Sequence, residues 1–196
     1  LCVTEIEVYN LPLLSGPGGG QALDAPYRPN EQGYVRHWLL CGPFPAPGNC
    51  WIRQEGWARD FLRDEWTGGH PEADIAPVAG RQHAVRFPDV PQAPWKPLEV
   101  RLAWFTWQGR DDGLVDVGAA LGAPALDLPS HPEQVIAYAA TYVTSPQDDR
   151  LTLSVGSDDG IRVWINGAVV LDRFVYRSAT PDSDAAHVQL RAGPNR

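Results

Sequence analysis

Short stretches in which apolar and polar residues alternate run along the chain and predict a protein built mainly from strands. The clearest pair is Leu151–Val155 and Ile161–Ile165, in which every second residue is aliphatic, as expected for strands that bury one face. The five residues Gly156–Gly160 separate them and predict a hairpin loop that makes the two strands neighbours. Asn166-Gly167 then predicts a tight turn into a further strand, Ala168–Leu171.

Other stretches of the chain show the same alternation and predict further strands. These are Leu1–Asn10, 34–41, 84–87, Leu98–Trp107, Gln134–Val143 and a strand that begins at Val188. Glu55–Trp66 has helical spacing instead, because Trp57 and Phe61 are four residues apart. Many short strands with one short helix and long Pro/Gly-rich loops predict an all-β protein, a β-sandwich or jelly roll.

The alternation stops over residues 11–33, where Gly and Pro gather and a linker is predicted. Two arrangements follow for Leu1–Asn10. Either this strand is the tail of a preceding module and the β-sandwich domain spans 34–196, or the strand fills a place in the sheet and 11–33 is a crossover loop. A turn at 192–195 close to Arg196 predicts that the domain lacks its last strand, and the absence of Met predicts a piece of a larger protein.

Composition narrows the function classes. The 196 residues include 19 Gly, 19 Pro and 8 Trp, with a formal net charge of −8. Neutralising phosphates needs a basic face, so the charge predicts no nucleic-acid partner, and it argues equally against an anionic membrane surface. No apolar run reaches the length of about 18 residues that a membrane span requires.

Three cysteines bear on the compartment. Cys41 and Cys50 bracket a proline-stiffened loop, and a disulfide between them would close a short ring. Such a disulfide implies an exported protein, extracellular or periplasmic. The alternative is that these residues and Cys2 are buried thiols.

The residues Ala137–Arg196 resemble a recurring bacterial β-sandwich module, through the runs AYAATYVTSP, LTLSVGSDDGIRVWINGAVV and LRAGPNR. The SDDG and VWING segments also resemble the PA14 domain and the galactose-binding-like jelly roll of family 2 glycosidases. Leu1–Asn10 resembles the closing strand of a discoidin-type domain. The resemblance implies a non-catalytic accessory module of a larger secreted bacterial protein. Its partners would be a polysaccharide or glycan and neighbouring domains of the same polypeptide.

Asp158 and Asp159 form the first candidate site. Adjacent carboxylates at a loop, with Asn166 one strand away, could supply hard oxygen ligands for Ca²⁺. In sugar-binding PA14 domains, which this segment resembles, paired Asp residues hold Ca²⁺ and the ion grips sugar hydroxyls. The alternative is a loop without metal, because Asp and Gly also suit the backbone of a tight turn.

Tryptophans supply the other candidate ligand residues. Alternation places Trp164 on the same face as Arg162, opposite Ile161 and Val163, where an exposed indole could stack on a sugar ring. The alternative is a Trp164 covered by another segment. Trp107 is the second candidate, as part of an aromatic patch at a strand end or of a second layer of core.

Two pairs of adjacent carboxylates, Asp111-Asp112 and Asp158-Asp159, raise the question of catalysis. Glycosidases place two carboxylates on either side of the bond they cleave, but both pairs lie in turn-like contexts, so no catalytic residue is predicted. A carbohydrate-binding or accessory module is therefore expected. The alternatives are a structural spacer or protein-contact domain, with Trp164 and Trp107 buried and no groove, and part of a glycoside-active enzyme.

Overall fold

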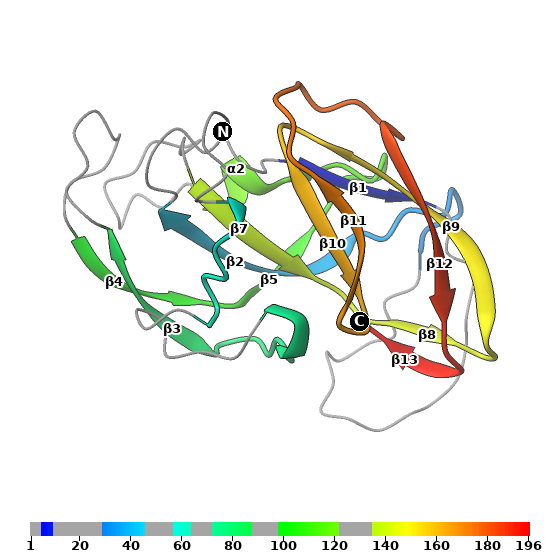
Figure 1. Ribbon diagram of the computed structural model, residues 1–196, viewed down its shortest axis with the longest axis horizontal. Coiled ribbons are helices and arrows are strands. Elements are labelled where there is room, and N and C mark those ends of the chain that lie inside the picture. The colour runs from blue at the N-terminus through cyan, green and yellow to red at the C-terminus, as the bar shows by residue number, and fades with distance from the viewer. Residues whose placement is uncertain (1–4, 10–28, 46–56, 64–71, 88–97, 122–134) are drawn as a thin grey trace.

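The computed structural model describes residues 5–9, 29–45, 57–63, 72–87, 98–121 and 135–196 (Figure 1). Strands dominate these ranges, and the predicted all-β class is confirmed. The strands are β1 (Glu5–Tyr9), β2 (His37–Pro45), β3 (Gln82–Phe87), β4 (Leu98–Ala103), β5 (Phe105–Gln108), β6 (Val115–Asp116), β7 (Val135–Ala140), β8 (Val143–Ser145), β9 (Asp149–Ser157), β10 (Ile161–Ile165), β11 (Ala168–Arg173), β12 (Asp184–Leu190) and β13 (Gly193–Asn195).

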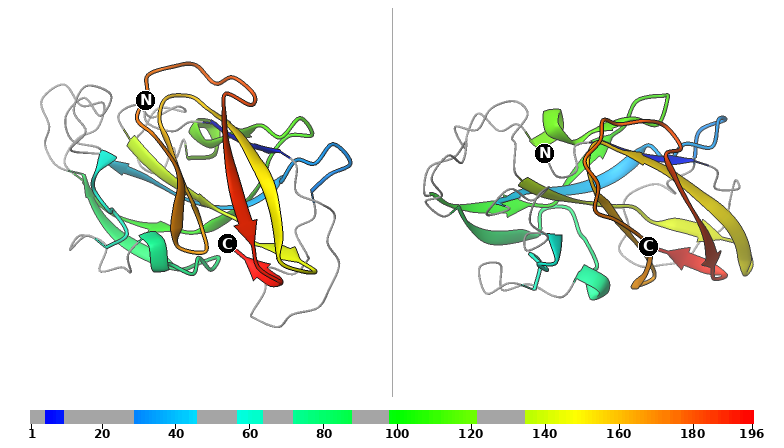
Figure 2. Two further views of the ribbon diagram at one scale, coloured as in Figure 1. Left: turned by 45° about the vertical axis from the view of Figure 1, so that its right-hand side comes forward. Right: turned by 45° about the horizontal axis from the view of Figure 1, so that its top comes forward.

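The strands form antiparallel sheets that pack as a β-sandwich. One sheet has four strands in the order β12-β9-β1-β6, and a second has three in the order β5-β2-β7. Three strand pairs complete the arrangement: β10-β11, β13-β8 and β3-β4. Figures 1 and 2 show the β3-β4 pair and the β9-β12 pair on opposite sides of the central β5-β2-β7 sheet.

Strand β2 explains why the central sheet is covered on both faces. Its successive side chains point to opposite faces, and all of them from Trp38 to Phe44 are buried. Trp38 and Leu40 join a core shared with β9, β10, β11 and β12. Leu39 and Cys41 join a second core with β3, β4 and the turn at 61–63. A continuous apolar run therefore marks a strand buried on both sides.

The predicted hairpin between Leu151–Val155 and Ile161–Ile165 is wrong. β9 pairs with β1 and β12, whereas β10 pairs with β11 in a different sheet. The chain turns a corner after Ser157, whose hydroxyl donates to the carbonyl of Asp159 at 2.8 Å. Asp159 adopts a φ of 57°, so the chain does turn here, but the turn directs it to another sheet.

The helix predicted at Glu55–Trp66 is wrong over residues 59–63, although Trp57 has helical backbone. Residues 59–63 have no helical backbone, because the Asp60 carboxylate accepts the N–H groups of Leu62 and Arg63 and closes a turn instead. The remaining positions, 55–56 and 64–66, lie outside the described residues. A short helix, α2, lies at Val117–Leu121, and no helix in the described ranges is long and apolar enough to cross a membrane.

The predicted strand Leu98–Trp107 is divided at Trp104. The backbone N–H of Trp104 donates to the carbonyl of Arg81 at 3.0 Å, and its carbonyl accepts the N–H of Gly80 at 2.8 Å. β4 pairs with β3 before this point, and β5 pairs with β2 after it. One continuous segment thereby connects two sheets, as corner strands do in sandwiches.

The N-terminal strand lies within the sandwich. β1 pairs with β9 along Ile6–Tyr9 and with β6 at Glu5 and Ile6, which matches the arrangement in which this strand fills a place in the sheet. Residues 11–28 of the predicted linker lie outside the described residues, and the domain boundary at residue 34 stays a prediction.

Of the three cysteines, Cys41 lies within the described residues. Cys41 is a free, fully buried thiol, and burial raises its pKa to about 12. Cys2 and Cys50 lie outside the described residues. The structure therefore does not show the predicted Cys41–Cys50 disulfide.

Candidate functional site

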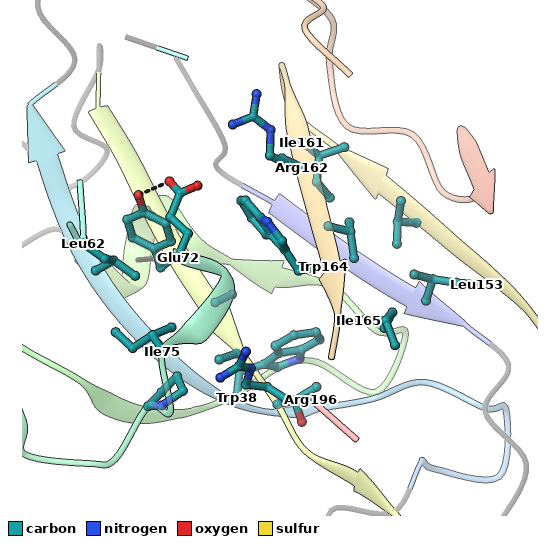
Figure 3. Close-up of a pocket in the computed structure, with 18 of the residues that line it drawn as sticks. Trp38, Leu62, Glu72, Ile75, Leu153, Ile161, Arg162, Trp164, Ile165 and Arg196 are labelled. Carbon is teal, nitrogen blue, oxygen red and sulfur yellow. Dashed lines mark hydrogen bonds between the residues drawn. The ribbon is translucent and has the colours of Figure 1, made fainter. Parts of the chain in front are cut away.

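A cavity of about 190 Å³ lies between β10, the central sheet and the 3-10 turn η1 (Glu72–Asp74). Figure 3 shows Trp164, Arg162, Glu72 and Trp38 around it. Most of the lining is aliphatic or aromatic, with a few polar groups, which is the usual make-up of a small-molecule site. The charged side chains that line it are Arg59, Glu72, Arg162 and Arg196.

Trp164 and Arg162 reach the cavity together. The Arg162 guanidinium carbon lies 5.9 Å from the centre of the Trp164 ring and 5.1 Å from that of Trp57. Both distances are within the range of cation–π attraction. The guanidinium thus lies against two indole rings, and Trp57 itself packs against Phe174 at 5.8 Å.

Asp172 on β11 fixes this group of side chains. Its carboxylate accepts the Arg162 Nε–H at 3.0 Å and the Trp57 indole N–H at 2.9 Å. Arg162 also donates to the backbone carbonyl of Trp57 at 3.3 Å. One carboxylate therefore ties the loop that carries Trp57 to the β10-β11 pair, and the aromatic wall of the cavity is held in place before any ligand arrives.

Glu72 and Tyr138 form the polar corner of the cavity. The Tyr138 hydroxyl donates to the Glu72 carboxylate at 2.5 Å (Figure 3) and accepts the backbone N–H of Phe61 at 3.1 Å. The backbone N–H of Glu72 donates to Asp60 at 3.0 Å. Asp60 therefore orders both the 61–63 turn and the start of η1, and this places Glu72 against β7.

Burial changes the acid–base behaviour of this corner. Desolvation raises the pKa of Glu72 to about 7, helped by the nearby Asp60 charge and opposed by the Tyr138 hydrogen bond and by Arg162. Burial together with the neighbouring Glu72 raises the pKa of Tyr138 well above its usual value. Near neutral pH both the protonated and the ionised form of the Glu72 carboxyl group are therefore populated. The first can donate a hydrogen bond to a ligand, and the second can accept one.

The opposite part of the cavity is formed by Trp38 and Arg196. The Trp38 indole N–H donates to the Val35 carbonyl at 3.0 Å. The Arg196 guanidinium donates to the Ala73 carbonyl at 2.6 Å. Its backbone N–H donates to the side chain of Asn166, and its carbonyl accepts the Asn166 N–H at 2.8 Å. The turn between β10 and β11 therefore positions Arg196.

The three predicted calcium ligands do not share a site. Asp158 and Asp159 precede β10 and Asn166 follows it, so that the five residues of this strand lie between them and span roughly 13 Å. Asp159 is buried, and its carboxylate accepts the backbone N–H of Arg177 at 3.1 Å. In the part of the chain that the structure describes, no three His, Cys, Asp or Glu side chains cluster to hold a metal ion.

Of the predicted ligand residues, Trp164 and Arg162 line the cavity, and Trp107, Asp158 and Asp159 do not. Trp107 is half-buried on β5 and packs against the first core.

The other acidic pair is engaged on the surface. Asp111 forms an ion pair with Arg36 at 2.7 Å, and Asp112 forms one with Arg110 at 2.6 Å. Both aspartates are exposed. Their carboxylates are therefore held by arginines and are remote from the lining of the cavity.

Several lining residues were not predicted from the sequence, among them Trp38, Trp57, Glu72, Tyr138 and Arg196. Trp38 and Tyr138 lie in predicted strands, where an aromatic residue is expected to pack in the hydrophobic core. Trp57 was assigned to a helix. Glu72 follows Pro71 in a segment rich in Gly, Pro and charge, and nothing local distinguishes it from a solvated loop residue.

Comparison with known protein families finds a match over part of the chain. Residues 126–192 match the PA14 domain, so the chain contains a PA14-like module. The match spans β7 to β12, which carry Tyr138, Arg162 and Trp164, whereas Trp57 and Glu72 lie outside it. No curated protein and no solved structure matches the chain. PA14 domains are often carbohydrate-binding or accessory modules.

Proposed function

We propose that this PA14-like module binds carbohydrate, without catalysis, in the cavity between Trp164 and Trp38. The observation that carries the proposal is the wall formed by Trp164, Arg162 and Trp57, which Asp172 holds in place. An aromatic ring offers the flat apolar surface on which the apolar face of a pyranose stacks. A prearranged wall also lowers the entropy cost of binding.

The polar groups of the cavity suit sugar hydroxyls. Glu72 supplies carboxyl oxygens that can accept hydrogen bonds, and Arg196 supplies donors. The volume of about 190 Å³ is below the range of about 300–1,000 Å³ usual for drug-sized ligands. A single sugar unit of a longer chain is therefore the expected occupant.

The charge distribution supports binding over hydrolysis. Glycoside hydrolases use two carboxyl groups that flank the scissile bond. Among the described lining residues the carboxyl side chain is that of Glu72. Asp172, the next carboxylate, is engaged by Arg162 and Trp57.

The spacer alternative fits the cavity less well. A domain that only separates neighbours has no need for a half-buried Trp164 beside a cavity with four charged groups. As a binding module in a larger secreted protein, the chain would hold a polysaccharide close to neighbouring domains. An extracellular or periplasmic location belongs to this proposal.

A glycan array followed by calorimetric titration tests the proposal. We expect the wild-type protein to bind at least one glycan, and Trp164→Ala to weaken that binding tenfold or more, because stacking on one aromatic ring is worth about 0.5–1.5 kcal/mol in addition to its buried area. Trp107→Ala is the matched control, since Trp107 is half-buried outside the cavity lining, and it should bind as the wild type does.

Calcium provides a further comparison in the same titration. The prediction that Ca²⁺ contributes is retained for Asp158, which is only partly buried, and titrations with Ca²⁺ and with a chelator measure it. Absence of binding to every polysaccharide under both conditions would refute the carbohydrate-binding function.

A further inference from the structure

We propose that the cavity selects an acidic sugar, a uronic acid unit whose carboxylate binds the Arg196 guanidinium. This inference rests on the proposed carbohydrate-binding function and names the substrate class of that site. It begins from the charges that line the cavity, which among the described residues are three arginines and one glutamate. The whole chain has a net charge of −8, so a cationic lining runs against the composition of the molecule.

The three arginines are engaged to different degrees. Arg162 already pairs with Asp172 at 3.0 Å, and the Arg59 guanidinium lies 5.3 Å from the centre of the Phe61 ring. Arg196 donates to the Ala73 carbonyl, and none of the described carboxylates forms an ion pair with it. Its positive charge can therefore be neutralised by a ligand carboxylate.

The Arg196 side chain is also prearranged. Asn166 holds its backbone through two hydrogen bonds, at 2.8 and 3.1 Å, and Ala73 accepts from one of its terminal nitrogens. A guanidinium has five N–H donors in a fixed plane, which match a carboxylate in a two-bond geometry. The remaining donors of Arg196 can therefore receive an anion without a large loss of side-chain entropy.

Glu72 does not cancel this charge. Its carboxyl group is bonded to Tyr138, and the charges that act on it are those of Asp60, Arg162 and Asp172. Figure 3 shows Glu72 in the upper part of the view and Arg196 in the lower part, with Trp164 on the side of β10. A pyranose on the Trp164 wall would then have one end near Glu72, which suits hydroxyls, and the other near Arg196, which suits a carboxylate.

Calorimetric titration with matched acid and ester ligands tests the proposal. The probes are D-glucuronate, D-galacturonate and D-mannuronate, each beside its neutral methyl ester, with the parent neutral sugars. We expect at least one acid to bind about tenfold more tightly than its own ester, because charge-assisted hydrogen bonds are stronger than neutral ones. Added salt should weaken the acid and leave the ester unchanged.

Two variants locate the effect. Arg196→Gln should remove the preference for the acid, so that the acid and its ester bind with equal affinity. Arg191→Gln is the control, because Arg191 is an exposed arginine close in sequence and outside the cavity lining, and it should keep the preference. An acid that binds no more tightly than its ester, or a preference that survives in Arg196→Gln, overturns the acidic-sugar proposal alone. Failure of acids, esters and neutral sugars to bind overturns the carbohydrate-binding function as well.

Discussion

Glu72 is a side chain of the proposed binding cavity whose pKa is changed by burial. A carboxyl group that lines an apolar cavity loses hydration, and its pKa rises to about 7 in spite of the hydrogen bond from Tyr138. The ordinary value is 4.5, so the folded state binds this proton more tightly than the unfolded state does. The group therefore stabilises the fold fully below about pH 4.5, and this contribution is lost as pH rises through about 7.

Replacing Glu72 by Gln should remove that part of the pH dependence. The free energy of unfolding of the wild type, compared with that of Glu72→Gln, should fall by about 1 kcal/mol or more between pH 4.5 and 8, allowing for partial exposure of the group. Urea unfolding of both proteins at a series of pH values measures the difference. Parallel pH profiles for the two proteins would show that Glu72 ionises normally in the fold.

Cavity residues could be predicted from the sequence where they lie on a strand with a clear alternation of apolar and polar residues. Alternation in Ile161–Ile165 selected Trp164 and Arg162, and both line it. The partners Trp57 and Glu72 come from other segments, and each is held by a group distant in sequence, Asp172 for the first and Asp60 for the second. No local sequence pattern shows these long-range contacts, so the positions of Trp57 and Glu72 in the cavity could not be predicted.

At the level of the element, the corner between β9 and β10 shows that turn residues predict where the chain turns but not which strand it pairs with next. Asp and Gly residues at 158–160 correctly indicate that the chain reverses. They do not say which strand becomes the neighbour, because β9 is already flanked by β1 and β12. The corner then brings Gly160 against Trp57 and the carbonyl of Arg173.

Gly160→Ala should disturb this corner. An added Cβ would lie 2.9 Å from both the Arg173 carbonyl oxygen and the Trp57 ring, and we expect a loss of about 1–3 kcal/mol in stability. The displaced Trp57 ring should also change its indole N–H signal in nuclear magnetic resonance spectra. Gly80→Ala is the control: it has a φ of +83° and no atom within 4 Å, so it should cost stability and leave the Trp57 signal unchanged. An unshifted Trp57 signal in Gly160→Ala would contradict the packing described.

At the level of the whole molecule, the strands were predictable and their partners largely were not. The alternation located β3, β10, β11 and others, because each buries one face. Pairing depends on long-range packing, as in the insertion of β1 between β9 and β6. That insertion joins the first and the middle parts of the chain in one sheet.

Deletion of residues 1–10 tests whether β1 belongs to this domain. Because β1 pairs with both β9 and β6, its loss should expose two strand edges and lower the melting temperature by several degrees. Thermal unfolding followed by circular dichroism measures the change. An unchanged melting temperature would assign these residues to a separate module.

The central claim is that a sugar binds against Trp164 in the cavity. The indole N–H signals of the eight tryptophans can be assigned by single Trp→Phe variants and followed during titration with a glycan selected on the array. If the sugar binds in the cavity, the signals of Trp164, Trp57 and Trp38 should shift with one common binding curve, and the chemical shift of Trp107 should not change. A titration in which Trp107 shifts, or in which Trp164 does not, would contradict it.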